Sequence, residues 1–303
     1  EDGRIQMGIQ SEEVNWLKNE EENVIGFVQQ GQLWSFDFGQ NRLSLVYGFA
    51  DGDDGRGTYD AHDFRILSVE DSGSMDFLVY GYMNRGRYEG MSGVLLCRYD
   101  ALLNTVEEQF FLPSDHPYQA VKEELGALAA ENANGTAWLS YGGQILQINL
   151  ADCSVQVLEE NVSQDDLKIS GNGALAAWTA AEGTAISLLD VQSGRIREIR
   201  AESGEVLQAL GFMEEDFIYG TAYASDIVTN LAGEETIPMY RVVIRDHSGN
   251  EVREFNYTSR GKYVVGVTIV ENRIDLECVS RQEDGSYAEA LPEPITYTSE
   301  SEP

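Results

Sequence analysis

Cysteine and proline are scarce in this chain, and each shortage excludes a class of protein. The three cysteines, Cys97, Cys153 and Cys278, lie far apart with no Cys-x-x-Cys spacing, so neither a zinc site nor a disulfide framework is indicated. The 303 residues include only six prolines and no low-complexity run, which argues against a disordered chain. No apolar stretch approaches the roughly 18 residues that a membrane helix requires. We therefore expect a globular chain without a membrane span.

Basic side chains are also few. The 20 Lys and Arg residues stand against 52 Asp and Glu residues, which gives a formal net charge of -32 at pH 7. Such a field repels polyanions, so we expect no nucleic-acid partner and no direct insertion into an anionic membrane. It also favours a soluble monomer, while cationic partners and metal ions stay open.

The first residue, Glu1, is not followed by the basic and then apolar run of a signal peptide. We therefore expect a processed or trimmed protein that is secreted or anchored at the cell surface. Any signal or anchor would lie outside this sequence.

Catalytic motifs are missing as well. The three histidines are His62, His116 and His247, and no Gly-x-Ser-x-Gly elbow or His-Glu-x-x-His helix accompanies them. The sequence therefore lacks the motifs that serine hydrolases and zinc proteases require for catalysis. The sialidase box Ser-x-Asp-x-Gly-x-Thr-Trp is absent too. We assign no catalytic residue and expect no cofactor, although a carboxylate pair for glycoside chemistry stays open because acidic residues are so abundant.

In many segments of the chain, apolar residues recur at every second position. Short runs of β-branched and aromatic residues, such as RIQMGI, LWSFDF, FLVYGY, ILQINL and KYVVGVTIV, are bounded by Gly, Asn, Asp or Ser. This pattern is typical of strands and predicts an all-β chain. One exception is the stretch from Tyr118 to Leu125, whose helical spacing predicts a turn or two of helix.

The strands recur in units of about 50 residues, each with four strands, which is typical of β-propeller blades. We expect one β-propeller domain of about six four-stranded blades, with a β-sandwich as the alternative. The N-terminal strand at residues 3–10 would complete the last blade and close the ring. The expected blades span approximately residues 11–50, 63–113, 118–160, 165–201, 205–258 and 262–303.

The unit from Asp166 to Ala201 resembles the blades of TolB-like and WD40-like propellers. The residues that carry the resemblance are Ser170, Asn172, Gly173, Trp178, Asp190 and Gly194. The Gly-His and Trp-Asp dipeptides of true WD40 repeats are absent, which puts a WD40-type partner role in doubt. Over its whole length the chain resembles extracellular propellers of Gram-positive gut bacteria, a group whose resemblance implies a fold and a location but no assigned function.

The loops between the expected strands fall into a long group and a short group. In propellers, the links from second to third strand and from blade to blade share one face, and here they include the longest links: Ala50–Asp63, Asn84–Gly93, Pro113–Tyr118 and Ala224–Met239. Long loops on a rigid scaffold tend to carry function, so we expect the first two and the last to converge on one binding face.

Candidate residues follow from this placement. Arg and Tyr dominate binding hot spots, and Arg suits a carboxylate, a sugar or a protein partner. The candidate binding residues are Tyr59, His62, Arg85, Arg87, Tyr88, Tyr223 and Asp226. Asp51, Asp53 and Asp54, with Asp60, are weak calcium candidates, because the early Gly55 and the missing twelfth-position Glu fail the EF-hand pattern. We also expect Trp34, Trp138 and Trp178 to be buried between blades.

These features favour a non-catalytic binding or scaffolding propeller at a bacterial surface, which engages a protein or glycan through the long-loop face. The alternative is a polysaccharide hydrolase or lyase that uses paired carboxylates in the central funnel. A carboxylate pair roughly 5 to 9.5 Å apart would favour the enzyme. A ligand-sensing domain of a larger membrane protein is a third hypothesis.

Overall fold

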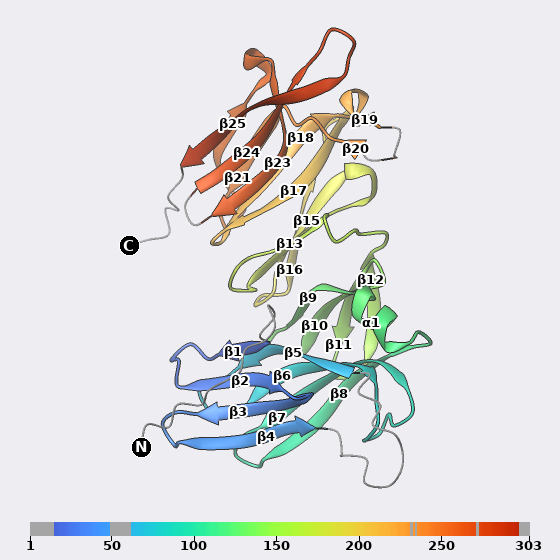
Figure 1. Ribbon diagram of the computed structural model, residues 1–303, viewed down its shortest axis with the longest axis vertical. Helices are drawn as coiled ribbons and strands as arrows, with labels where there is room; N and C mark the ends of the chain where they lie inside the picture. Colours follow the sequence, from blue (N-terminus) through green and yellow to red (C-terminus); the bar gives the residue numbers. More distant parts are fainter. Residues whose placement is uncertain (1–14, 49–61, 231–232, 234, 271–272, 297–303) are drawn as a thin grey trace. The chain divides into compact units, whose positions relative to one another are not determined.

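The computed structural model describes residues 15–48, 62–230, 233, 235–270 and 273–296 (Figure 1). The chain divides into two compact units, Glu1–Leu125 (unit 1) and Gly126–Pro303 (unit 2). No helix among the described residues is long and apolar enough to cross a membrane.

Unit 1 contains two antiparallel sheets whose four strands pair in chain order. The first sheet has β1 (Trp16–Lys18), β2 (Val24–Gln29), β3 (Gln32–Asp37) and β4 (Arg42–Gly48), and the second has β5 (His62–Val69), β6 (Met75–Tyr82), β7 (Ser92–Asp100) and β8 (Thr105–Ser114). The helix α1 (Tyr118–Glu124) confirms the helical spacing of the sequence.

The core of unit 1 forms where β2 packs against β5 and α1 packs against β6 and β7. β6 is buried along almost its whole length, which explains why its sequence MDFLVYGY is nearly all apolar. The largest buried side chains of this core include Leu33, Phe64, Met75, Phe77, Leu95 and Tyr99.

Unit 2 contains three sheets of four strands and one of three, in the part that the structure describes. Their strands are β9 (Leu125–Glu131), β10 (Thr136–Tyr141), β11 (Gln144–Asn149) and β12 (Ser154–Glu159); β13 (Leu167–Ile169), β14 (Leu175–Thr179), β15 (Ala185–Asp190) and β16 (Arg195–Arg200); β17 (Glu205–Met213), β18 (Asp216–Tyr223), β21 (Arg241–Arg245) and β22 (Glu251–Asn256); and β23 (Lys262–Val270), β24 (Arg273–Arg281) and β25 (Tyr287–Thr296). A small hairpin, β19 (Val228–Thr229) and β20 (Glu235–Thr236), lies between β18 and β21.

Each sheet of unit 2 shares a hydrophobic core with the next one along the chain. Trp138 of the first sheet and Trp178 of the second are each 1% exposed and lie in one cluster. A second cluster joins the β14 and β15 residues to Phe217 and Tyr219 of β18, and a third joins Ile218 to Leu276 of the last sheet. Successive sheets packed face to face are how blades bury their apolar surfaces.

Local signals explain the turns. In the second sheet of unit 2, the Ser170 hydroxyl accepts a hydrogen bond from the backbone N–H of Leu175, and Gly173 adopts a φ of 71°. Gly194 also has a positive φ, and a Cβ added there would stand 3.4 Å from the Trp138 ring. The turn glycine therefore lies against the buried indole, and its positive φ is what favours glycine at this position.

The chain is all-β, and its consecutive antiparallel sheets have the β-propeller fold class that the sequence predicts. The expected closing strand at residues 3–10 lies outside the described residues. The burial of Trp138 and Trp178 is confirmed, but Trp34 is only half-buried. The reason is that Trp34 pairs with Leu45 on the side of the first sheet opposite Leu33, whereas the unit 1 core forms on the Leu33 side.

Candidate functional site

The β6–β7 loop of unit 1 lies at the end of the second sheet where β5 begins. His62 at the start of β5 stands opposite Gly81 near the end of β6, and Ser92 at the start of β7 stands opposite Ser114 at the end of β8. The loop from β6 to β7 therefore shares this end with His62, as chain connectivity predicts. Whether the long loops of the two units converge stays a prediction.

His62 and Arg85 are held by neighbouring backbone. The His62 Nε2 lies 3.1 Å from the carbonyl oxygen of Gly31, and its ring makes an edge contact with Phe64. The Arg85 guanidinium donates to the carbonyl of Gly48 and lies 5.0 Å from the centre of the Tyr47 ring. These two side chains therefore tie the β6–β7 loop region to the first sheet.

Arg87 and Tyr88 form the outer part of an aromatic stack. The Tyr88 ring lies 4.2 Å from that of Phe111, at 17° between planes, and the Arg87 guanidinium lies 5.4 Å from the centre of Tyr88. Gly86 makes this approach to β8 possible, because its φ is 82° and a Cβ would lie 2.2 Å from a Glu108 carboxylate oxygen. Arg87 is exposed, so its charge is presented to solvent over the stack.

The link from β18 to β21 builds a different surface in unit 2. Tyr223 is 43% exposed and stacks on Tyr240 at 4.5 Å with 9° between planes. Tyr240 is buried, and its hydroxyl donates to the Glu205 carboxylate. Burial and then this hydrogen bond raise the pKa of Tyr240. Arg241 lies 3.8 Å from Glu205 and 3.7 Å from Glu254, so ion pairs and the Tyr240 hydrogen bond support the exposed Tyr223 from below.

Asp226 serves to join two sheets of unit 2. Its carboxylate lies 3.1 Å from the Arg281 guanidinium, and the Tyr287 hydroxyl donates to its backbone carbonyl at 3.4 Å. Tyr287 in turn meets Tyr263 edge to face. The Asp226 side chain is only 15% exposed, so the ion pair rather than solvent takes most of its surface.

Five candidates lie outside the described residues: Tyr59 and the calcium candidates Asp51, Asp53, Asp54 and Asp60. Within the residues that are described, no group of three His, Cys, Asp or Glu side chains is arranged to hold a metal ion.

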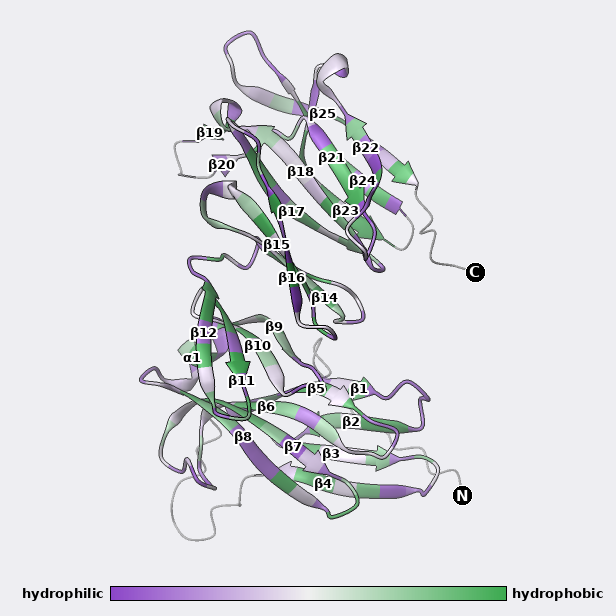
Figure 2. Ribbon diagram, turned by 180° about the vertical axis from the view of Figure 1, so that it is seen from behind, coloured by the Kyte–Doolittle hydropathy of each residue, from purple (hydrophilic) through white to green (hydrophobic). Residues whose placement is uncertain are grey.

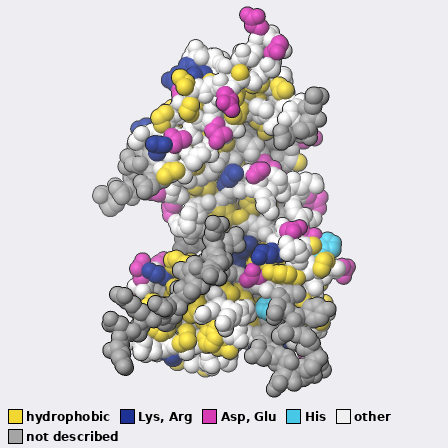
Figure 3. Space-filling model, viewed as in Figure 1, with side chains coloured by type: hydrophobic (Ala, Val, Ile, Leu, Met, Phe, Trp, Pro, Cys, Tyr) yellow, Lys and Arg dark blue, Asp and Glu magenta, His cyan; other side chains and the backbone are white. Residues whose placement is uncertain are grey.

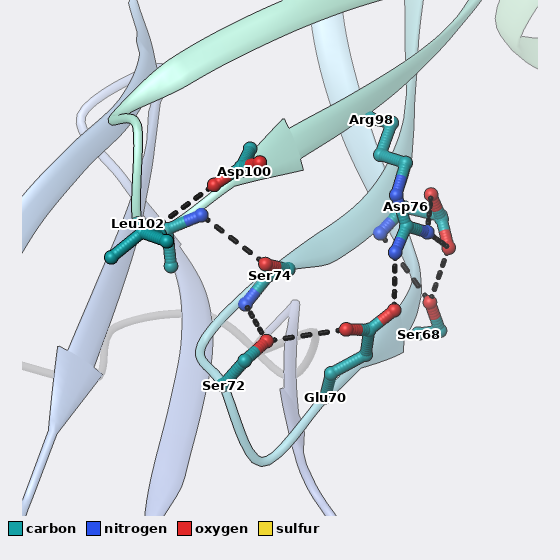
Figure 4. Close-up of polar contacts among 9 residues, drawn as sticks. Ser68, Glu70, Ser72, Ser74, Asp76, Arg98, Asp100 and Leu102 are labelled. Atoms are coloured by element: carbon teal, nitrogen blue, oxygen red, sulfur yellow. Dashed lines mark hydrogen bonds and ion pairs between the residues drawn. The ribbon is translucent and has the colours of Figure 1, made fainter.

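A pair of carboxylates, Glu70 and Asp76, lies at the other end of the second sheet of unit 1 and was not predicted from the sequence. Arg98 on β7 stands directly opposite Asp76 on β6 and contacts both Asp76 and Glu70 (Figure 4). Ser68 donates to Asp76, and the backbone N–H of Ala101 donates to Ser74, so the network fixes two adjacent turns. The available signal was an Asp inside an apolar strand, which requires a partner when buried.

Two carboxylates of unit 2 have lowered pKa values. A hydrogen bond from the Ser154 hydroxyl lowers the pKa of Asp152, and one from Lys262 lowers the pKa of Glu293. A glycosidase acid requires a raised pKa. On the face drawn in Figure 3, acidic side chains are spread over both units rather than gathered at one place.

Comparison with known proteins gives a general likeness. No protein-family model and no curated protein sequence matches the chain. Dipeptidyl peptidase 4 of Porphyromonas gingivalis is 12% identical over 93% of this chain and 46% of its own, with a TM-score of 0.46. An oligogalacturonate lyase in complex with manganese is 10% identical over 95% and 77%, with a TM-score of 0.45. TolB from Acinetobacter baumannii is 12% identical over 69% and 51%, with a TM-score of 0.34.

This chain therefore spans about half the length of the peptidase and of TolB. Likenesses of this strength carry no inference about activity. The fold class rests on the sheets themselves.

Proposed function

We propose that this chain is a non-catalytic binding module of a bacterial cell surface, which engages a protein or glycan through the strand ends that carry its longest links. The location follows the sequence resemblance to extracellular propellers.

The observation that carries the proposal is the tyrosine platform of unit 2, formed by Tyr223 on Tyr240. An exposed aromatic face that is stacked on a buried ring loses little conformational freedom when a ligand binds. The platform is held from below by the Tyr240 hydroxyl bond to Glu205 and by the Arg241 ion pairs. Sugar rings and apolar side chains both pack well against such a face.

The same contacts argue for binding rather than catalysis. Glu205 already accepts a hydrogen bond from Tyr240 and pairs with Arg241, and it is 9% exposed. Both contacts use the Glu205 carboxylate to hold Tyr240 and Arg241 in place beneath the platform. The platform therefore positions a ligand without supplying an acid or a base.

The test is binding of the labelled protein to a glycan array and to intact Gram-positive cells, with Tyr223→Ala as the variant. Leu102→Ala is the matched control, because Leu102 is 91% exposed at the β7–β8 turn, the opposite end of the unit 1 strands. We expect Tyr223→Ala to weaken binding about tenfold and the control to bind as wild type. Unchanged binding by Tyr223→Ala would exclude the platform as the site.

A further inference from the structure

The outermost strand of a sheet exposes unpaired backbone groups, and natural proteins protect such edges with charges, prolines or bulges. Each described sheet has two edge strands, and after the first sheet the edge strands that come last in the chain are β8, β12, β16, β22 and β25. Comparing the sequences of these five shows which of them is least protected against pairing with another strand.

Four of these five edges are protected. β16 carries Arg195, Arg197, Glu198 and Arg200, and β22 carries Glu251, Arg253 and Glu254. β8 carries Glu107, Glu108 and Pro113, and β25 carries Glu289, Pro292, Glu293 and Pro294. The edge strand of the first sheet, β4, lies against β8 within unit 1.

β12 is the exception. Its residues from Ser154 to Leu158 include no charge and no proline. Val155 and Val157 are 43% and 44% exposed, although they stand opposite the buried Ile148 and Leu146 of β11. The apolar side of this sheet thus continues to its edge strand, while β16, a strand of the same length in the next sheet, carries four charged residues (Figure 2).

The charges at the ends of β12 indicate which kind of strand could pair with its edge. Asp152 precedes the strand, Glu159 is its last residue, and Glu160 follows it. A second copy paired antiparallel about Gln156 would bring Asp152 opposite Glu160, where like charges repel. A segment with Lys or Arg at both ends would instead place opposite charges beside each other at both ends of β12.

We propose that the free edge of β12 receives an extended segment of another protein, with apolar residues at alternate positions and Lys or Arg at both ends. Main-chain hydrogen bonds to the open edge supply the affinity of such strand addition. Packing on Val155 and Val157 and the end charges supply its specificity. This surface is separate from the tyrosine platform.

The probe is a fluorescently labelled peptide, KKVTVTVKK, whose binding is followed by anisotropy. Two control peptides separate charge from strand pairing: EEVTVTVEE reverses the end charges, and KKVPVPVKK keeps the charge but removes two backbone donors. We expect the first peptide to bind about tenfold more tightly than either control. Equal binding of the two basic peptides would show charge attraction alone and would overturn the proposal.

Variants locate the site. The double variant Val155→Ser with Val157→Ser keeps the net charge and should weaken the peptide at least about fivefold, because Ser lowers strand propensity and removes the apolar contact. Ile196→Ser on β16 is the matched control, since Ile196 is 37% exposed on a protected edge, and it should bind as wild type.

Hydrogen exchange provides a second readout. The peptide should slow exchange of amides between Ser154 and Leu158, and protection confined to another strand would overturn the assignment. A concentration-dependent dimer in sedimentation velocity that the double variant abolishes would show that a second copy is the occupant, and would also overturn it.

Discussion

The two long second-to-third-strand links that the structure describes use the same residue types in opposite ways. In unit 1, Arg85 donates a hydrogen bond to the Gly48 carbonyl and Tyr88 stacks on Phe111. These two side chains therefore hold the loop in place. In unit 2, Tyr223 keeps 43% of its surface exposed on top of the buried Tyr240. The difference teaches that a binding residue is distinguished by what supports it rather than by its type.

The largest expected effect comes from removing the support of the unit 2 platform. Tyr240→Ala should lower the free energy of unfolding by about 3 kcal/mol, because it deletes a buried ring. Tyr240→Phe should cost about 1 to 2 kcal/mol, since it removes only the hydrogen bond to Glu205. Urea unfolding of both variants measures the difference. Equal costs would show that the ring itself contributes nothing.

A smaller effect tests how tightly the unit 1 link is built. Gly86 and Gly90 have φ values of 82° and 89°, but a Cβ would meet Glu108 only at Gly86. Gly90→Ala should therefore cost about 1 kcal/mol for the backbone conformation alone. Gly86→Ala should cost somewhat more, because the Glu108 carboxylate must move away from the backbone N–H of Arg87 that donates to it. If thermal unfolding shows the same cost for both, the link is not packed against β8.

The smallest effect concerns the ion pairs of Glu293 in the last sheet of unit 2. A hydrogen bond from Lys262, together with the nearby Arg260 charge, lowers the pKa of Glu293 below 4.5. A carboxyl whose pKa is lowered by folding stabilises the protein above its unfolded pKa, and the contribution is lost as pH falls through the folded pKa.

Glu293→Gln should thus cost about 1 kcal/mol or less at pH 7, and the cost should disappear as pH falls through the folded pKa of Glu293, as measured by unfolding over a series of pH values. Glu21→Gln at an exposed turn is the control. A cost that persists at low pH would mean that the charge is not what matters.

The sequence predicts local structure well because its signals are local. Ser170, Asn172 and Gly194 mark turns through bonds that span a few residues, and the period of two marks the strands. Contacts across the chain carry no such signal. Nothing in the segment around Arg85 indicates that its partner is the Gly48 carbonyl, and nothing near Trp34 indicates that its side of the sheet lies away from the core.

The candidate residues show the same limit. Residue type and loop length point to Tyr223, Arg87 and Asp226 equally. The stack on Tyr240, and the use of Asp226 in an ion pair with Arg281, depend on residues that lie far away in the sequence. The role of Asp76 was missed for the same reason, because Arg98 reaches it only through strand pairing.

The most direct measurement is the dissociation constant of a ligand that the array or cell assay identifies, determined for wild type, Tyr223→Ala and Arg87→Ala. If the tyrosine platform of unit 2 is the binding site, Tyr223→Ala weakens binding about tenfold, and Arg87→Ala changes it less than about twofold. The reverse order would place the site on the unit 1 link and contradict the account.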